Sequence, residues 1–532
     1  MRVLLVEPEY RRASASFRAM RENTNKKKID DERLWYPPLG LMKLSTFHKR
    51  RGDDVHFVNF CDPSLFSSGD LFSAPILWDR VYITTLFTFD WDNVIKTINF
   101  FKEAVGGSTH KVMVGGIMAT LMADEIFEET GVYPIKGVIN SPQQIKLDGY
   151  VDIDLLPPDY SILSPNLYAI NDTYYGYTTR GCTQNCPWCG VPKIEPEYHG
   201  YIDIKPAISQ LISSESKKLY GEKFRLKLMD NNILASPYLE RIVNDLVALK
   251  YGRGEYTELH PKKMKVIDFN QGLDATHVTE ENLQILKRLN IRPMRIAFDR
   301  IQEKEQYEKA LRLSEKYGFR EFSNYMLYGW KDTPRDLYDR LVVNIRLNEE
   351  WKEKNDCEPA VIYSYPMRFA PIFDLDGTGA NKFRNRAYEQ GQLGEFDMLY
   401  GAKWSSRFVR NVEIIKGAAH GAISPTPGYA WRAIGHDYEE FVANLYMPEE
   451  LLRNRNKHEA KIYPYDPDRT PGTGKVEEFR EFIYKNIKEP TKEFLIFHQA
   501  VSENSMAATR AGLEKLTNQE MREWLQYYLR KD

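Results

Sequence analysis

The chain has 532 residues, of which 42% are hydrophobic and 28% charged, as in an ordinary globular protein that buries several cores. Its 73 basic and 75 acidic residues nearly balance, so no overall field attracts it to nucleic acid or to a membrane surface. Met1 to Val6 run straight into Glu7-Pro8, too short for a signal peptide, and no run of about 18 apolar residues follows. We therefore expect a cytoplasmic protein with reduced cysteines.

The first 150 residues alternate short apolar runs with amphipathic segments. The pattern predicts strands at 2–7, 55–60, 81–87 and 111–114, and helices at 37–51, 91–104 and 122–130. Such alternation is typical of a doubly wound parallel sheet of the Rossmann type. The charged segment 11–33 shows neither period and is either a solvated loop or a flap that contacts a substrate.

Ligands of doubly wound sheets bind at the carboxyl ends of the strands. Thr85 and Thr88 follow the predicted third strand, and Gly115 and Gly116 follow the fourth. Residues 151–172, rich in Asp and Pro, then predict a connector to a second domain.

A second alternation fills residues 173–370. Strands are predicted at 174–179, 224–229, 265–269, 294–298, 322–327 and 360–365, and the helices between them at 206–219, 237–249, 280–289, 303–317 and 334–351. These six strands and their helices predict a second α/β domain.

Three of the five cysteines, Cys182, Cys186 and Cys189, lie within eight residues in the spacing C-x3-C-x2-C, directly after the first of these strands. Three thiolates on one tight loop can hold an iron–sulfur cluster, and a [4Fe–4S] cluster held by three thiolates keeps one iron open to a substrate. A zinc site would usually add a second cysteine pair or a regularly spaced histidine. An odd number of clustered cysteines in a chain without a secretory signal argues against a disulfide. The other two cysteines, Cys61 and Cys357, are expected to be free, buried thiols.

The cysteine loop, with Trp188 before its last cysteine, resembles that of the radical SAM superfamily. The resemblance implies a partial (βα)6 barrel over 173–370 and a [4Fe–4S] cluster whose open iron chelates S-adenosylmethionine. It also implies an external one-electron reductant of the flavodoxin or ferredoxin type, and reductive cleavage to a 5′-deoxyadenosyl radical.

The preceding Rossmann-type unit resembles the cobalamin-binding domain of one large radical SAM subgroup, in which Thr85, Thr88, Gly115 and Gly116 would lie against the corrinoid. The motif D-x-H-x-x-G is absent, so cobalamin would bind without a histidine ligand, or the domain is an empty relic.

The resemblance also assigns residues near the cluster to S-adenosylmethionine. Besides Trp188, they follow the second, third and fourth strands of the second alternation: Asp230, Asn231, Asn232, Asn270, Gln271, Asp299 and Arg300. Each could instead cap a helix or stabilise a turn. No catalytic residue beyond the cluster site is predicted.

Residues 371–532 predict a mainly helical extension that caps the barrel mouth. Helices are expected at 448–455, 475–484 and 518–529, and a linker at 464–474. The extension has no cysteine, which excludes a second cluster within it.

Three hypotheses remain open. The first is a radical SAM enzyme acting on an unidentified small or medium-sized substrate, with or without cobalamin. The second is radical SAM modification of tRNA or of a peptide, to which the basic residues 26–28 could contribute. The third is a non-enzymatic iron–sulfur electron carrier or sensor, although a carrier would normally use four cysteines.

Overall fold

The computed structural model describes residues 1–9, 36–66, 77–258, 260–354, 358–369, 404–417, 421–462 and 470–529. The predicted flap 11–33, Cys357 and part of the predicted linker lie outside these residues. In the described part of the chain there are two compact units, unit 1 with Met1–Gln271 and Glu281–Arg292, and unit 2 with Gly272–Glu280, residues 293–369 and the described residues from 404 onward. This division falls inside the predicted barrel, and the domain boundaries at 150, 172 and 370 stay predictions.

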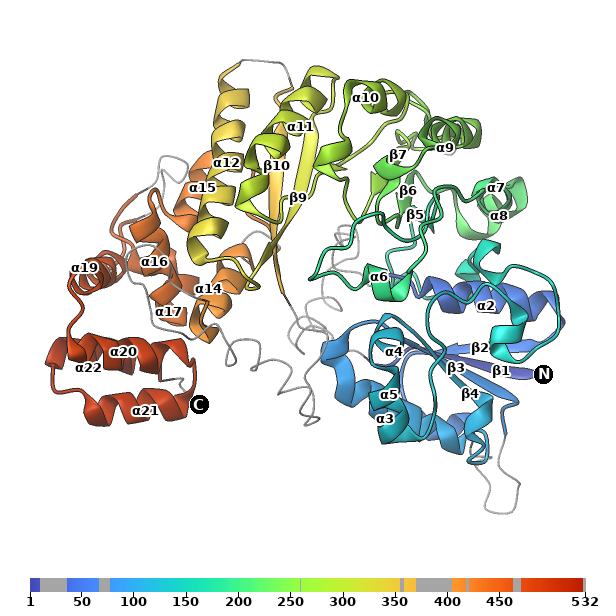
Figure 1. Cartoon of the computed structure of the whole chain (residues 1–532), viewed down its shortest axis with the longest axis horizontal. Coiled ribbons are helices and arrows are strands. Elements are labelled where there is room, and N and C mark those ends of the chain that lie inside the picture. The colour runs from blue at the N-terminus through green and yellow to red at the C-terminus, as the bar shows by residue number, and fades with distance from the viewer. Residues whose placement is uncertain are drawn as a thin grey trace. The chain divides into compact units, whose positions relative to one another are not determined.

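Unit 1 opens with a parallel sheet of four strands in the order β2-β1-β3-β4. Its elements are β1 (Arg2–Val6), α2 (Leu39–Arg50), β2 (Asp54–Val58), β3 (Arg80–Thr85), α3 (Trp91–Glu103), β4 (Val112–Gly116), α4 (Ile117–Leu121) and α5 (Ala123–Thr130). Helix α2 covers one face of the sheet, and α3 and α5 cover the other (Figure 1). The strand order reverses between β1 and β3, where such sheets bind ligands.

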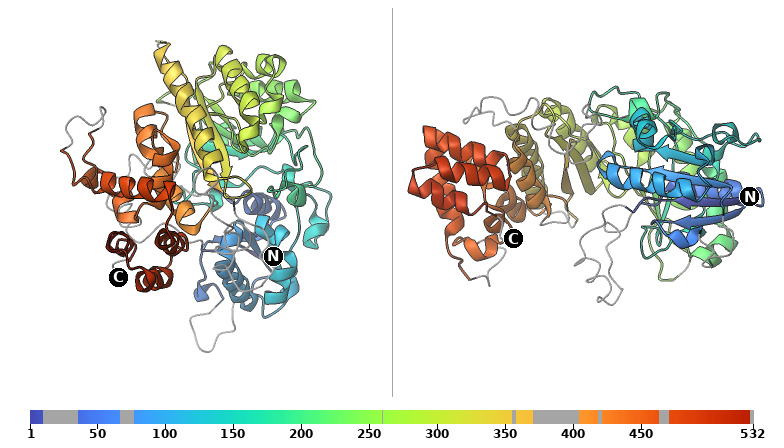
Figure 2. Two further views of the ribbon diagram at one scale, coloured as in Figure 1. Left: turned by 60° about the vertical axis from the view of Figure 1, so that its left-hand side comes forward. Right: turned by 90° about the horizontal axis from the view of Figure 1, so that it is seen from below.

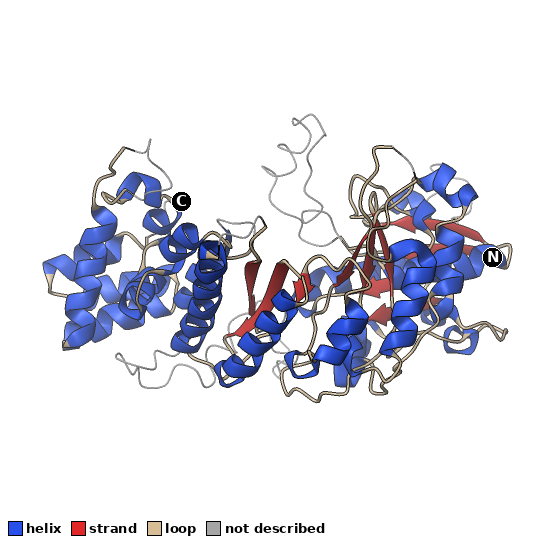
Figure 3. Cartoon of the chain, turned by 90° about the horizontal axis from the view of Figure 1, so that it is seen from above, coloured by secondary structure: helices blue, strands red, loops and turns tan. Residues whose placement is uncertain are grey.

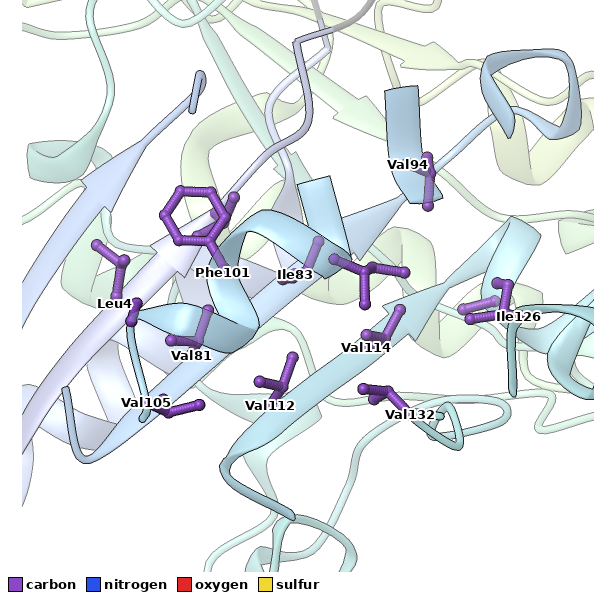
Figure 4. Close-up of a cluster of buried hydrophobic side chains, with 14 of the residues drawn as sticks. Leu4, Val81, Ile83, Val94, Phe101, Val105, Val112, Val114, Ile126 and Val132 are labelled. Atoms are coloured by element: carbon purple, nitrogen blue, oxygen red, sulfur yellow. The ribbon is translucent and has the colours of Figure 1, made fainter. Parts of the chain in front are cut away.

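Both faces of this sheet are buried. Leu4 and Val81 pack against Phe101 of α3 on one face (Figure 4), while Val3 packs with Leu41 of α2 on the other. Because neighbouring strand residues point to opposite faces, each strand must be apolar along its length. The short continuous apolar runs in the sequence have this origin.

The six strands of the second alternation are all present and parallel, in two sheets of three. Unit 1 contains the sheet β5-β6-β7 and unit 2 the sheet β10-β9-β8. The elements are β5 (Thr173–Gly176), α6 (Val191–Ile194), α7 (Lys205–Leu211), α8 (Ser214–Tyr220), β6 (Arg225–Leu228), α9 (Leu239–Leu246), β7 (Val266–Phe269), α10 (Glu280–Leu286), β8 (Met294–Arg295), α11 (Lys304–Lys316), β9 (Glu321–Tyr328), α12 (Pro334–Glu353) and β10 (Val361–Arg368). The α/β class is confirmed, whereas closure into one partial barrel stays a prediction.

Two predicted elements of this region differ in the structure. The predicted helix 206–219 is two helices, α7 and α8, because the Ser213 side chain accepts a hydrogen bond from the Ser216 N–H (3.3 Å) and caps a new helix. The predicted strand 294–298 is paired as a ladder only at Met294–Arg295. The Phe298 N–H still donates to the Tyr325 carbonyl (3.1 Å), so the chain continues beside β9.

Helices make up most of the described residues after Arg368 (Figure 3). They are α14 (Ser406–Gly417), α15 (Pro427–Ile434), α16 (Tyr438–Tyr446), α17 (Glu449–Arg453), α18 (Arg455–His458), α19 (Lys475–Lys488), α20 (Lys492–Ser502), α21 (Met506–Lys515) and α22 (Gln519–Gln526). Helices α20, α21 and α22 lie side by side (red in Figure 2). Throughout the described ranges, no helix has the length and apolar character that crossing a bilayer requires.

Lys223, just before β6, provides a test of how burial affects stability. The side chain is 3% exposed, and its ammonium donates to the carbonyl oxygens of Tyr220 (3.2 Å) and Asn171 (3.4 Å). Burial lowers the pKa of Lys223 to about 8. Because this value lies below that of an unfolded lysine, the contribution of Lys223 to stability rises with pH between about 8 and 10.5, and its full cost is present below pH 8.

We expect Lys223→Met to raise the free energy of unfolding by about 1–3 kcal/mol at pH 7, and the gain to disappear towards pH 10.5. Urea unfolding at pH 7 and pH 10 measures the difference from the wild type. Lys218→Met, a change at an exposed lysine of α8, should alter stability by less than about 0.5 kcal/mol at either pH. If Lys223→Met were less stable than the wild type at pH 7, the charged ammonium of Lys223 would not be costing stability as expected.

Candidate functional site

The cysteines of the motif lie on the loop between β5 and α6. Cys182, Cys186 and Cys189 are partly exposed and form no disulfide. The backbone N–H groups of Gln184 and Val191 donate to the sulfur atoms of Cys182 (3.3 Å) and Cys189 (3.5 Å). Local backbone hydrogen bonds thus hold the sulfur atoms of the first and the last cysteine of the loop.

Across the residues that the structure describes, no three His, Cys, Asp or Glu side chains converge on a point that could hold one metal ion. A zinc site needs such convergence, since all its ligands meet one ion. A [4Fe–4S] cluster binds each thiolate at a different iron, and its ligands do not meet at one point. The spacing of the three cysteines, and not this absence, favours a cluster over a single zinc ion.

The entry to the loop is fixed by Gly181. This residue has a φ of +72°, and a Cβ on it would lie 2.3 Å from the carbonyl oxygen of Glu197. A glycine is required there, because a side chain would meet backbone and strain the left-handed conformation.

Asp230 follows β6 and holds the two residues that lead into the cysteine loop. One carboxylate oxygen, Oδ1, accepts hydrogen bonds from the N–H and the hydroxyl of Thr178 (2.8 and 2.9 Å), and from the N–H and the hydroxyl (2.7 Å) of Thr179. The residue is 1% exposed, and its second oxygen, Oδ2, is buried with no hydrogen-bond partner among the residues that the structure describes. Burial raises the pKa of Asp230, although the four hydrogen bonds oppose it.

Asn232 places a second unpartnered acceptor near the loop. Its amide nitrogen lies 3.4 Å from the hydroxyl of Thr183, which stands between the first two cysteines. Its buried Oδ1 has no hydrogen-bond partner in the described part of the chain. Asn231 donates from its side chain to Glu195 (3.0 Å), the residue that follows α6. The predicted segment 230–232 and the cysteine loop are thus brought together.

Asn270 and Gln271, after β7, are placed differently. Asn270 is buried, and its Oδ1 accepts a hydrogen bond from the hydroxyl of Tyr36 (2.9 Å), which in turn accepts one from the Lys227 ammonium (3.2 Å). Gln271 is exposed. No contact of either residue with the cysteine loop is seen in the described part of unit 1, so their predicted ligand roles stay predictions.

Asp299 and Arg300 belong to unit 2, and only their contacts within that unit are considered. The Leu327 N–H donates to Asp299 Oδ1 (3.1 Å), and Arg300 pairs with Glu303 (2.6 Å). Burial raises the pKa of Asp299. The contacts of Asp299 and Arg300 stabilise local structure, which is the alternative to ligand binding that the sequence left open.

Trp188, on the cysteine loop of unit 1, is partly exposed.

The predicted corrinoid edge follows β3 and β4. The Thr85 hydroxyl donates to the Gly115 carbonyl (3.1 Å) and accepts from the Ala119 N–H (2.8 Å). A Cβ on Gly116 would lie 2.2 Å from the Thr85 carbonyl oxygen. Internal packing therefore accounts for Thr85 and Gly116 without a ligand, and Thr88 begins a short 3-10 turn.

No family model and no curated protein matches this chain. The solved structures that are similar to it include the following two. The cobalamin-dependent S-adenosylmethionine radical enzyme OxsB, with aqua-cobalamin and S-adenosylmethionine bound, is 14% identical with a TM-score of 0.46, over 99% of this chain and 70% of that one. HydG, a maturase of the [FeFe]-hydrogenase, is 12% identical with a TM-score of 0.27, over 83% of this chain and 97% of that one.

Proposed function

We propose that this protein is a radical SAM enzyme in which Cys182, Cys186 and Cys189 hold a [4Fe–4S] cluster. The observation that carries the proposal is the position of two buried unpartnered acceptors, Asp230 Oδ2 and Asn232 Oδ1, beside a loop with three thiols. When bound, such a cluster supplies the electron that cleaves S-adenosylmethionine and starts radical chemistry.

The two acceptors suit an ammonium group, which has three N–H donors and no acceptor. Asp230 is held by Thr178 and Thr179 through one oxygen, which leaves the other for the amino group of S-adenosylmethionine. A bound cation would also offset the cost of burying this carboxylate. The residues present therefore fit the methionyl end of the cosubstrate.

Cobalamin has no comparable support. The hydroxyl of Thr85 has both its hydrogen bonds inside the protein, and Gly116 is explained by its contact with Thr85. Whether the sheet edge binds a corrinoid is tested by adding hydroxocobalamin to the assay below.

The proposal extends to the surroundings of the site. It includes the Rossmann-type first domain, the partial (βα)6 barrel, a cytoplasmic location and a reductant of the flavodoxin or ferredoxin type. A small or medium-sized substrate is favoured over tRNA by the balance of 73 basic and 75 acidic residues.

The test is an anaerobic assay of the full chain reconstituted with iron and sulfide, reduced with dithionite and supplied with S-adenosylmethionine. We expect cluster absorbance, about four irons per chain and formation of 5′-deoxyadenosine. A protein that takes up no iron, or that binds a cluster without cleaving S-adenosylmethionine, would contradict the proposal, and the second result would favour an electron carrier or sensor.

A further inference from the structure

Four charged side chains form a chain of ion pairs next to the cysteine loop. The Lys43 ammonium lies 2.6 Å from Asp154, whose carboxylate also meets the Arg180 guanidinium at 2.5 Å; Arg180 in turn lies 2.8 Å from Glu195. All four side chains are between 10% and 13% exposed. Such pairs are screened by solvent much less than surface pairs, and their charges act over a longer range.

Glu195 ties the two ends of the loop together. It directly follows α6, at the end of the loop, and its Oε2 accepts a hydrogen bond from the N–H of Gly181, at the start of the loop (2.6 Å). The same oxygen accepts a hydrogen bond from Asn231 (3.0 Å). One carboxylate thus joins the beginning of the cysteine loop, its end and the segment after β6.

Arg180 is fixed as firmly as Glu195. Its guanidinium carbon lies 3.4 Å from the centroid of the Tyr177 ring, and its backbone pairs with that of His199. Lys43 lies on α2, the helix that covers one face of the first sheet, and its ion pair holds Asp154 against Arg180. Although burial raises the pKa of Asp154, the neighbouring Lys43 and Arg180 hold it below its usual value, which keeps the carboxylate charged.

We propose that these four residues, the loop clamp, position the cysteine loop and set the reduction potential of its cluster. This inference rests on the proposed function. Two cations and two anions cancel in the clamp, so removing one charge leaves a net charge of known sign close to Cys182. A unit charge at about 10 Å, with an effective dielectric constant of about 20, changes an equilibrium constant about tenfold. For one electron this corresponds to about 59 mV.

The test compares two substitutions of opposite charge in the full chain reconstituted with iron and sulfide. Glu195→Gln leaves the clamp positive and should favour the reduced cluster about tenfold, whereas Arg180→Gln leaves it negative and should favour the oxidised cluster by a similar factor. A redox titration in the absence of S-adenosylmethionine, followed by electron paramagnetic resonance, measures the reduction potential of the cluster in each variant. A loop that is merely loosened would shift both potentials in the same direction or lose the cluster.

The chain provides a matched control at Glu197, two residues from Glu195, whose side chain is 83% exposed. Glu197→Gln removes the same charge but should change the ratio of reduced to oxidised cluster less than about twofold, because solvent screens it. Arg180→Lys keeps the charge and should return the potential close to that of the wild type.

Arg180→Gln leaves two buried carboxylates with one cation fewer and can unfold the chain, so Lys43→Met is the second variant. It should shift the potential in the same direction as Arg180→Gln but less, because Arg180 remains. The loop clamp would be overturned if Glu195→Gln and Lys43→Met shifted the reduction potential in the same direction, or if neither shift exceeded that of Glu197→Gln. The proposed function would still stand in that case, provided that the wild type cleaves S-adenosylmethionine. A wild type without a cluster would overturn both.

Discussion

Replacing Cys186 by alanine is expected to abolish 5′-deoxyadenosine formation. Cys186 lies between the other two cysteines of the loop, and its loss leaves two thiolates for a cluster that needs at least three. The rate should fall about a thousandfold or more, because the group that supplies the electron is lost rather than weakened. Iron content and cluster absorbance should fall with it, and both are measured on the reconstituted protein.

Cys61→Ala is the matched control. Cys61 packs against the core of the first sheet, and its thiol lies 3.9 Å from the Thr97 hydroxyl. The variant should keep the cluster and cleave S-adenosylmethionine within about twofold of the wild-type rate, because the change is a small one in a partly buried position. If Cys186→Ala kept its activity, or Cys61→Ala lost as much, the three-cysteine site would be wrong.

The α/β organisation could be predicted because short apolar runs and amphipathic segments carry different periods. The first strand, predicted at 2–7, is β1 (Arg2–Val6), and the predicted helix 334–351 lies within α12 (Pro334–Glu353). Short elements lack enough residues to show a period, which is why α4 and α6 were missed. Pairing of the six later strands into two sheets depends on contacts between distant residues, and no local pattern encodes those contacts.

The site could be predicted in part. The cysteines were found by their spacing, and the segment 230–232 by its place after a strand. Asp230 forms its hydrogen bonds with residues 51 and 52 positions away in the sequence. Tyr36 donates a hydrogen bond to Asn270, 234 positions away. Such partners have no local pattern.

The loop clamp was missed, yet one of its residues was visible in the sequence. Lys43 lies between Met42 and Leu44 in α2, both buried, so a lysine stands among buried apolar residues of a helix. Buried lysines are usually paired with an anion, and Asp154 is the partner of Lys43. The partner's identity follows only from the fold, since 111 residues separate the two.

Asp230 gives the second large effect, because its two carboxylate oxygens have different tasks. Asp230→Asn keeps an oxygen that accepts from Thr178 and Thr179 but puts an N–H₂ group where Oδ2 stood, and this group repels an ammonium. We expect the affinity of the cluster-loaded protein for S-adenosylmethionine to fall about 10- to 100-fold, the usual worth of a hydrogen bond to a charged group. Equilibrium dialysis measures it, with Asp203→Asn, at a half-exposed carboxylate, as a control that should change nothing.

The stability of Asp230 variants should not follow their affinity for S-adenosylmethionine. Burial raises the pKa of Asp230, so the carboxylate costs stability at neutral pH, a cost that disappears as the pH falls below the unfolded value. Asp230→Asn should therefore be at least as stable as the wild type at pH 7. Asp230→Ala leaves the four donors of Thr178 and Thr179 without their acceptor and should lose about 2–5 kcal/mol.

Thermal unfolding and ligand binding thus separate the two oxygens of Asp230. If Oδ1 holds the fold and Oδ2 binds the ligand, Asp230→Asn loses affinity without losing stability, and Asp230→Ala loses both. Unchanged affinity in Asp230→Asn would remove Oδ2 from the ligand set, and an Asp230→Asn protein as unstable as Asp230→Ala would refute the structural role of Oδ1. A purely structural aspartate predicts no loss of affinity in a stable Asp230→Asn protein, so this single variant decides between a carboxylate that only supports the loop and one that also binds.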